Sequence, residues 1–196
     1  MEPVSFQIRG STIKISRCRE VYFPSDDTML LADCIVPCGK CLEIGCGSGL
    51  ASIMIAKMGF SILSSDINPE AIKCTERNAS SNGVKIKTVC CDLFSGIEGS
   101  FDTVIFNPPY LPGETYEEKV QGSEMWYGGE DGLQTARKFL SELGKHLNRG
   151  GKCYIILSSL TDIDGLQREF KQYEFQRLAE KKIFMETIYA YSLSPS

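Results

Sequence analysis

Four consecutive residues, Asn107-Pro108-Pro109-Tyr110, bring an amide, two prolines and a phenol together directly after an apolar run. The Asn side chain both donates and accepts hydrogen bonds, whereas a proline carbonyl can only accept them. Asn107 and the Pro108 carbonyl could therefore hold a flat NH₂ group while Tyr110 packs on its face. The alternative is an ordinary loop whose prolines simply end a strand.

A glycine-rich loop, Gly45-Cys46-Gly47-Ser48-Gly49, follows a short apolar segment at 41–44 and precedes an apolar helical pattern. A strand, a glycine loop and a helix N-terminus together form a site where backbone N–H groups receive an anionic or polar ligand. A dinucleotide fingerprint would need a small residue where Leu50 stands. The spacing present is instead Glu43-x-Gly45-x-Gly47-x-Gly49.

Two acidic residues end the next two predicted strands. Asp66 closes the segment 61–66, roughly 20 residues past the glycines, where a ribose-binding carboxylate is expected. Asp92, beside the apolar Leu93, follows the segment 85–90. An exposed surface acid is the alternative for Asp66, and the glycine loop upstream favours ligand binding.

Alternating strand and helix patterns must position these residues. The predicted core strands span 41–44, 61–66, 85–90, 101–106, 152–157, 175–179 and 187–192, with helices after Gly49 and Asn68 and at 131–147 and 166–173. This order predicts an α/β fold: a doubly wound, mostly parallel seven-stranded sheet with ligands at the carboxyl ends of its strands.

The N-terminal part, residues 1–37, is expected to add a hairpin (6–9 and 12–15) and a helix capped by Ser25 or Asp26. We expect a single domain of residues 1–196, with the core in 38–196. In the first turn of the helix, Asp27 and Thr28 are interpreted as local chemistry, Asp27 complementing the helix dipole. His146 receives the same interpretation at the end of the 131–147 helix.

Composition narrows the class of protein. The net charge of -4 argues against a protein that grips nucleic acid through its phosphates. No apolar run has the length of a membrane span, and the N-terminus lacks a secretory pattern, so we expect a cytoplasmic location. The polar stretch from Leu111 to Gly129, which holds Trp126, is expected to be a substrate lid or disordered.

Nine cysteines need a separate interpretation. Cys38 and Cys41 have the spacing of a redox or metal motif, with Cys34 and Cys46 nearby. Because Cys41 begins a strand and Cys46 lies in the glycine loop, convergence on one ion is disfavoured. We expect no metal site and small, buried, reduced thiols, with a disulfide or an occasional metal ligand as the alternative.

The four loops in order resemble those of class I S-adenosylmethionine-dependent methyltransferases that modify planar amide or amine nitrogens. Within that superfamily, the segments Val21–Thr28 and Gly128–Gly132 are similar to the HemK family, whose members methylate the glutamine of the Gly-Gly-Gln motif in class I release factors. The chain has no room for the N-terminal helical domain of bacterial members, so it resembles the short archaeal and eukaryotic branch. Phe23, where that branch usually has an acid, and Cys46 depart from the pattern.

The resemblance implies a role for each site residue. Asn107, Pro108, Pro109 and Tyr110 would bind the acceptor nitrogen, and orientation rather than a general base would supply the catalysis. The fold would be the Rossmann-like methyltransferase fold, and a small zinc-binding activator subunit is a possible partner. S-adenosylmethionine would be bound by Tyr22, Thr28, Glu43, Gly45, Cys46, Gly47, Gly49, Asp66, Ile67, Asp92, Leu93 and Asn107.

Two other functions remain open at this point. An adenine-N6 methyltransferase acting on DNA or RNA would meet the same flat NH₂ group, but it needs an extruded base and a basic surface. A non-catalytic subunit that keeps the fold as a binding module would not need complete glycine and Asn-Pro-Pro-Tyr loops.

Overall fold

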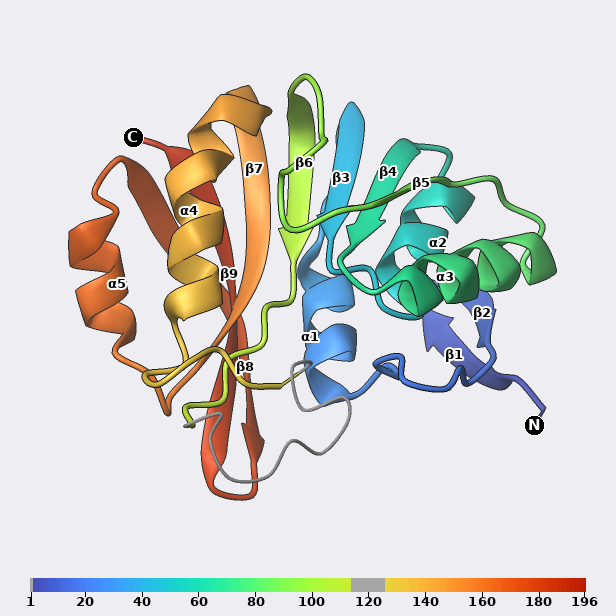
Figure 1. Ribbon diagram of the computed structural model, residues 1–196, viewed down its shortest axis with the longest axis horizontal. Coiled ribbons are helices and arrows are strands. Elements are labelled where there is room, and N and C mark those ends of the chain that lie inside the picture. Colours follow the sequence, from blue (N-terminus) through green and yellow to red (C-terminus); the bar gives the residue numbers. More distant parts are fainter. Residues whose placement is uncertain (1, 114–125) are drawn as a thin grey trace.

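The computed structural model describes residues 2–113 and 126–196, and its centre is a seven-stranded sheet (Figure 1). The strand order is β5-β4-β3-β6-β7-β9-β8. Pairing is parallel from β5 to β7 and antiparallel at β7–β9 and β8–β9. The predicted fold class is therefore confirmed. The strands are β3 (Lys40–Ile44), β4 (Ser61–Asp66), β5 (Lys87–Cys90), β6 (Phe101–Phe106), β7 (Leu147–Ser158), β8 (Tyr173–Ile183) and β9 (Glu186–Pro195).

Apolar side chains alternate across the sheet and build one core on each face. Along β6, Val104 and Phe106 join the core under α4 and α5, whereas Ile105 joins the core under α1 and α2. This alternation follows from the two-residue period of a strand. The helices are α1 (Asp26–Cys34), α2 (Leu50–Lys57), α3 (Pro69–Ser81), α4 (Gln134–His146) and α5 (Ile163–Glu169).

The N-terminal hairpin, β1 (Val4–Ile8) and β2 (Ser11–Ile15), packs against the second core through Ile8, Ile13 and Ile15. Two asparagines, one in α3 and one directly after it, fasten the hairpin. Asn82 accepts from the Lys14 backbone N–H at 2.9 Å and donates to its carbonyl at 2.7 Å. Asn78, fully buried, accepts from the Ser16 N–H at 3.0 Å. The predicted hairpin is confirmed and is fixed to the body of the fold.

The cysteines differ in part from expectation. Cys18 and Cys74 form a disulfide, so the prediction that all thiols are reduced is wrong. This bond ties the segment before α1 to α3. Its two cysteines are 56 residues apart in sequence, so no local pattern indicates the pairing. Cys38 and Cys90 are exposed, while Cys41, Cys46 and Cys153 are buried as predicted. Within residues 2–113 and 126–196, no three His, Cys, Asp or Glu side chains are grouped to hold a metal.

Helices α4 and α5 both begin next to an aspartate whose side chain accepts a backbone hydrogen bond, but only α5 is capped by it. α4 starts at Gln134 rather than 131 because Asp131 accepts from the Leu133 N–H at 3.0 Å and shapes a turn. α5 starts before the predicted 166 because Asp162 accepts from the Gly165 N–H at 2.8 Å.

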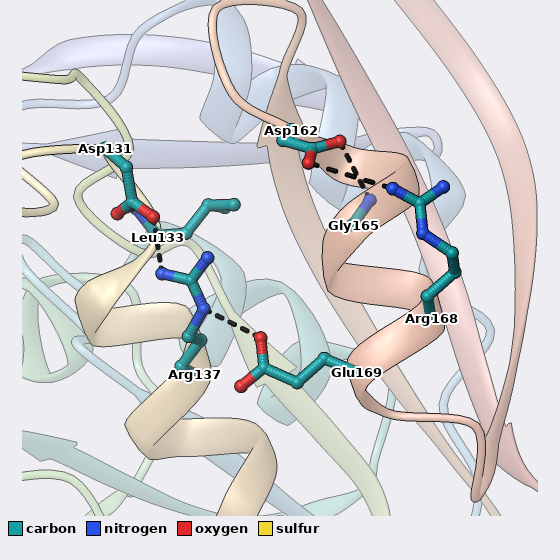
Figure 2. A network of polar contacts seen from close by, with 7 residues as sticks. All are labelled: Asp131, Leu133, Arg137, Asp162, Gly165, Arg168 and Glu169. Carbon is teal, nitrogen blue, oxygen red and sulfur yellow. Dashed lines mark hydrogen bonds and ion pairs between the residues drawn. The ribbon is translucent and has the colours of Figure 1, made fainter.

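Arg137 of α4 forms ion pairs with the turn before α4 and with the end of α5. Figure 2 shows Arg137 between Asp131 and Glu169, at 2.5 Å and 2.8 Å, and Arg168 near Asp162 at 3.9 Å. Arg137 is only partly exposed, and its two carboxylate partners come from the turn before α4 and from α5. The network therefore fixes the turn at Gly128–Gly132, which borders the site, to the helical layer.

Three further expectations concern positions away from the sheet. His146 ends α4, but its ring stacks on Phe94 at 4.5 Å and its Nδ1 lies 3.0 Å from the Gly99 carbonyl, so it has a packing role as well.

Most of the predicted lid, residues 114–125, lies outside the described residues. No helix in the part of the chain that the structure describes is long and apolar enough to cross a membrane.

Candidate functional site

A cavity of about 860 Å³ lies at the carboxyl ends of the parallel strands. The arrows of β4 and β6 point toward this edge, where α1 and the tip of the β8–β9 hairpin also lie (Figure 1). The cavity is lined from the segment before α1, from the loops after β3, β4, β5 and β6, and from Ile183 and Glu186 of the hairpin. All predicted site residues line it except Gly49.

The glycine loop takes a backbone conformation that suits glycine. Gly47 has φ +54° and Gly49 has φ +86°, both in the left-handed region. The Gly47 N–H donates to Asp66 Oδ2 at 2.9 Å, and its carbonyl accepts from Thr75 at 3.0 Å. Gly49 lies behind the loop, where an added Cβ would be 2.8 Å from Thr75 Oγ1. Close packing against α3 therefore requires a glycine at position 49.

Asp66 connects two of the predicted loops. Its Oδ2 accepts from Gly47 and its Oδ1 accepts from the Asn68 N–H at 2.9 Å. Burial raises the pKa of Asp66, and these backbone hydrogen bonds act in the opposite direction. Each carboxylate oxygen has a second lone pair, so Asp66 keeps acceptor capacity toward the cavity.

The adenine side of the predicted site lies after β5. Leu93 adopts φ +47°, an uncommon conformation for a branched apolar residue, at the point where its side chain lines the cavity. Asp92 precedes it, and Ile67, 68% exposed, forms part of the rim after β4. The structure therefore brings Ile67, Asp92 and Leu93 together as the sequence predicts.

Glu43 is buried beneath the glycine loop. Its Oε2 accepts a hydrogen bond from Ser52 of α2, and Ser52 lies 2.5 Å from Ser64. Burial raises the pKa of Glu43 from an ordinary 4.5 to about 8, although the Ser52 hydrogen bonds favour the charged form. Glu43 thus supports the loop through α2 while one face lines the cavity.

The Asn-Pro-Pro-Tyr corner is built around a residue that the sequence interpretation set aside. Asp27 lies in the first turn of α1, as expected of an acid that complements the helix dipole, but it is only 4% exposed and has further partners. Its Oδ2 accepts from Asn107 Nδ2 at 3.0 Å and from the Tyr110 hydroxyl at 3.1 Å. The Tyr22 hydroxyl donates to both oxygens, at 2.8 and 2.9 Å, and the Thr28 N–H donates to Oδ1 at 2.5 Å.

Asn107 keeps one unpaired atom. Its Oδ1 is buried and has no hydrogen-bond partner, the one such side-chain nitrogen or oxygen in the described residues. A buried acceptor without a partner costs about 1–3 kcal/mol, so it indicates a position where a ligand supplies the donor. Asn107 lines the cavity, and a ligand N–H group fits this requirement.

Two glycines downstream support the corner from behind. A Cβ on Gly128 would lie 2.5 Å from the Pro109 carbonyl, and one on Gly132 would lie 2.5 Å from the Tyr110 carbonyl. The Gly128 N–H donates to the Leu111 carbonyl at 3.0 Å. The Gly128–Gly132 segment noticed in the sequence therefore holds Pro109 and Tyr110 in place by close backbone packing.

The charge of the cavity has one sign. The described lining contains six acids and no Lys, Arg or His. Such a cavity attracts a cation and repels a polyanion. The acids are Glu20, Asp27, Glu43, Asp66, Asp92 and Glu186.

The raised pKa of Glu43 predicts a pH dependence of stability. The folded state binds the Glu43 proton up to about pH 8 and the unfolded state only up to about 4.5. The free energy of unfolding should therefore fall as the pH rises through this window, because the folded state alone still holds the proton. Glu43→Gln should remove much of this fall, measured by urea unfolding at about pH 5 and pH 8. Glu174→Gln, at an exposed position of β8, is the control. An unchanged slope in Glu43→Gln would contradict the assignment.

Comparison with known proteins adds named relatives. A Methanocaldococcus jannaschii protein provisionally named as a protein N5-glutamine methyltransferase is 42% identical over 154 residues, 76% of this chain and 78% of its own length. Methyltransferase HEMK2 of Mus musculus is 34% identical, and the match covers 70% of this chain and 72% of the HEMK2 chain. Ribosomal RNA small subunit methyltransferase C of Haemophilus influenzae is 32% identical but is matched over 38% of its length.

Solved structures agree on the fold. The Mtq2 chain of the E. cuniculi Mtq2–Trm112 complex, which methylates the translation termination factor eRF1, superposes with a TM-score of 0.73 at 22% identity over 90% of this chain. The model of the methyltransferase small domain matches residues 26–185. The chain therefore belongs to the methyltransferase small domain family.

Proposed function

We propose that this protein transfers a methyl group from S-adenosylmethionine to the side-chain amide nitrogen of the glutamine in the Gly-Gly-Gln motif of a class I release factor. The observation that carries the proposal is the unpaired, buried Oδ1 of Asn107 in an acid-lined cavity beside the glycine loop. The M. jannaschii relative and the E. cuniculi complex, named for glutamine and release factor methylation, support the same acceptor.

The residues present fit the cofactor. Its sulfonium is a cation, and the described cavity lining is acidic without a basic side chain. Asp66 would hold the ribose hydroxyls, and Asp92 with Leu93 would hold the adenine. Tyr22, Thr28, Glu43 and the glycine loop would surround the methionine part. When bound, S-adenosylmethionine supplies an electrophilic methyl group.

The acceptor nitrogen is activated by position. An amide nitrogen is a poor nucleophile because its lone pair is delocalised over the carbonyl. Asn107 Oδ1 and the Pro108 carbonyl would each accept one N–H of the substrate, with Tyr110 packed on the amide plane, so that the nitrogen lone pair faces the methyl group. Transfer would form the nitrogen–methyl bond in exchange for the sulfur–methyl bond, and the amide proton would then leave to water without a general base.

A glutamine fits the surroundings better than an adenine in nucleic acid. Binding to a phosphate backbone uses lysines and arginines, and the described lining has none. Next to the cavity, the β8–β9 hairpin ends in Phe184 and Met185, which are 93% and 82% exposed. Large exposed apolar side chains beside a site are typical of contact with another protein.

A small partner subunit belongs to the proposal. The E. cuniculi relative is found in complex with Trm112, and this chain superposes on 99% of that structure's Mtq2 chain. We therefore propose that a small zinc-binding activator assists this enzyme too. Because release factors act in translation, the proposed function places it in the cytoplasm.

Side-by-side methyl transfer tests the acceptor. Purified enzyme and labelled S-adenosylmethionine should label a class I release factor, and a Gln-to-Asn change in its Gly-Gly-Gln motif should abolish the label. Ribosomal RNA and adenine-containing DNA are assayed in parallel. Label on nucleic acid alone would establish the adenine alternative, and cofactor binding without transfer to any acceptor, with or without a small zinc-binding subunit, would establish the binding subunit.

Support of the acceptor corner by Gly132 predicts a selective loss of turnover. Gly132→Ala should lower kcat at least about tenfold, because its Cβ would displace the Tyr110 carbonyl. Gly83→Ala is a matched control, since Gly83 has φ +70°, close to the +74° of Gly132, but no atom within 4 Å of an added Cβ. The left-handed backbone alone should cost each variant about 1–2 kcal/mol of stability, and the contact with the Tyr110 carbonyl should add to this cost in Gly132→Ala. Equal kcat values in the two variants would contradict the supporting role.

A further inference from the structure

Asp27 is a buried carboxylate to which the proposed methyl transfer assigns no role. It is enclosed by α1, the segment before it and the loop after β6, and the described cavity lining offers it no cationic partner. Burying a charge is costly unless hydrogen bonds compensate for the lost water. A position so costly beside the acceptor corner indicates a role in the reaction.

The hydrogen bonds of Asp27 exclude a role as a general base. Five donors reach it: the hydroxyls of Tyr22, Tyr110 and Thr28, the Asn107 amide and the Thr28 N–H. A carboxylate has about four lone-pair positions, so these donors saturate it. Burial raises the pKa of both phenols, with Asp27 contributing, so they remain donors. Asp27 therefore has no free lone pair to take a proton from a substrate.

The same bonds define the orientation of the Asn107 amide. The oxygen and nitrogen of an Asn side chain have nearly the same shape, so packing alone hardly distinguishes the two flipped states. A carboxylate accepts but does not donate, so only Nδ2 can face Asp27 Oδ2, at 3.0 Å. Oδ1 must then be the atom left for a ligand, and it is the atom found unpaired.

We propose that Asp27 is a positioning residue that locks the Asn107 amide with its oxygen toward the acceptor nitrogen and its NH₂ away from it. The proposal rests on the proposed methylation of an NH₂ group. In the flipped state, the Asn107 NH₂ would oppose the NH₂ of the substrate, and neither could accept from the other. Asp27 thus sets the polarity of the acceptor site, which receives N–H groups and rejects a carbonyl in the same place.

The first test replaces the carboxylate by its isostere. Asn at position 27 can donate as well as accept, so both flips of Asn107 become possible. Asp27→Asn should lower kcat about 10- to 100-fold on the release factor, with S-adenosylmethionine Kd within about twofold of the wild-type value. Asp33→Asn, an exposed position on the same helix, is the matched control and should leave both values unchanged.

A polarity swap separates positioning from simple structural support. Asn107→Asp places two carboxylates together and should be nearly inactive. In the double variant Asp27→Asn/Asn107→Asp, the new amide can donate to the new carboxylate, whose other oxygen again faces the substrate. The double variant should therefore exceed Asn107→Asp in kcat by about tenfold, a non-additivity expected only of coupled residues.

Outcomes for the inference and for the proposed function are distinct. If the wild-type enzyme labels no release factor, with or without the small zinc-binding subunit, the proposed function fails. If it does so and Asp27→Asn keeps a normal kcat, the positioning role is wrong. A double variant no better than the product of the two single effects would also overturn it. Loss of cofactor binding or of cooperative thermal unfolding in Asp27→Asn would instead assign Asp27 to structural support and contradict the inference.

Discussion

The hydrogen bond from Asn107 Nδ2 to Asp27 Oδ2 is the contact on which the site depends. It joins the end of β6 to the start of α1 across 80 residues of sequence. The same carboxylate holds Tyr22 and Tyr110, so one buried group orients an amide and two phenols. Removing the Asp27 carboxylate would leave all of these donors without their shared acceptor in a buried place, which makes the cluster cooperative.

The rest of the fold brings the two ends of that bond together. The parallel strands β3 and β6 are neighbours, so the glycine loop and the Asn-Pro-Pro-Tyr corner leave the sheet at one edge. α1 is held by Leu31, Ala32 and Ile35 in the core, and Asp26 adds a 2.7 Å contact to Lys181 of the long hairpin. The methyl donor and the acceptor would thus meet between elements that are fixed independently.

How much the sequence predicts depends on whether a feature is local. The glycine loop, Asp66, Asp92 and Asn107 each follow a recognisable strand, and the rule that ligands bind at strand carboxyl ends brings them together. Features made by distant pairs were not predicted. Asp27 has the local pattern of a first-turn acid, and the Cys18–Cys74 bond spans 56 residues. The close backbone contact that requires glycine at 132 likewise exists only after folding.

The central claim is that Asn107 acts on the acceptor nitrogen and contributes little to holding the cofactor. Measuring S-adenosylmethionine Kd and kcat for Asn107→Ala tests it most directly. The account predicts a Kd within about twofold of the wild-type value and a kcat reduced at least about 100-fold. Weakened cofactor binding with normal turnover at saturating cofactor would contradict it.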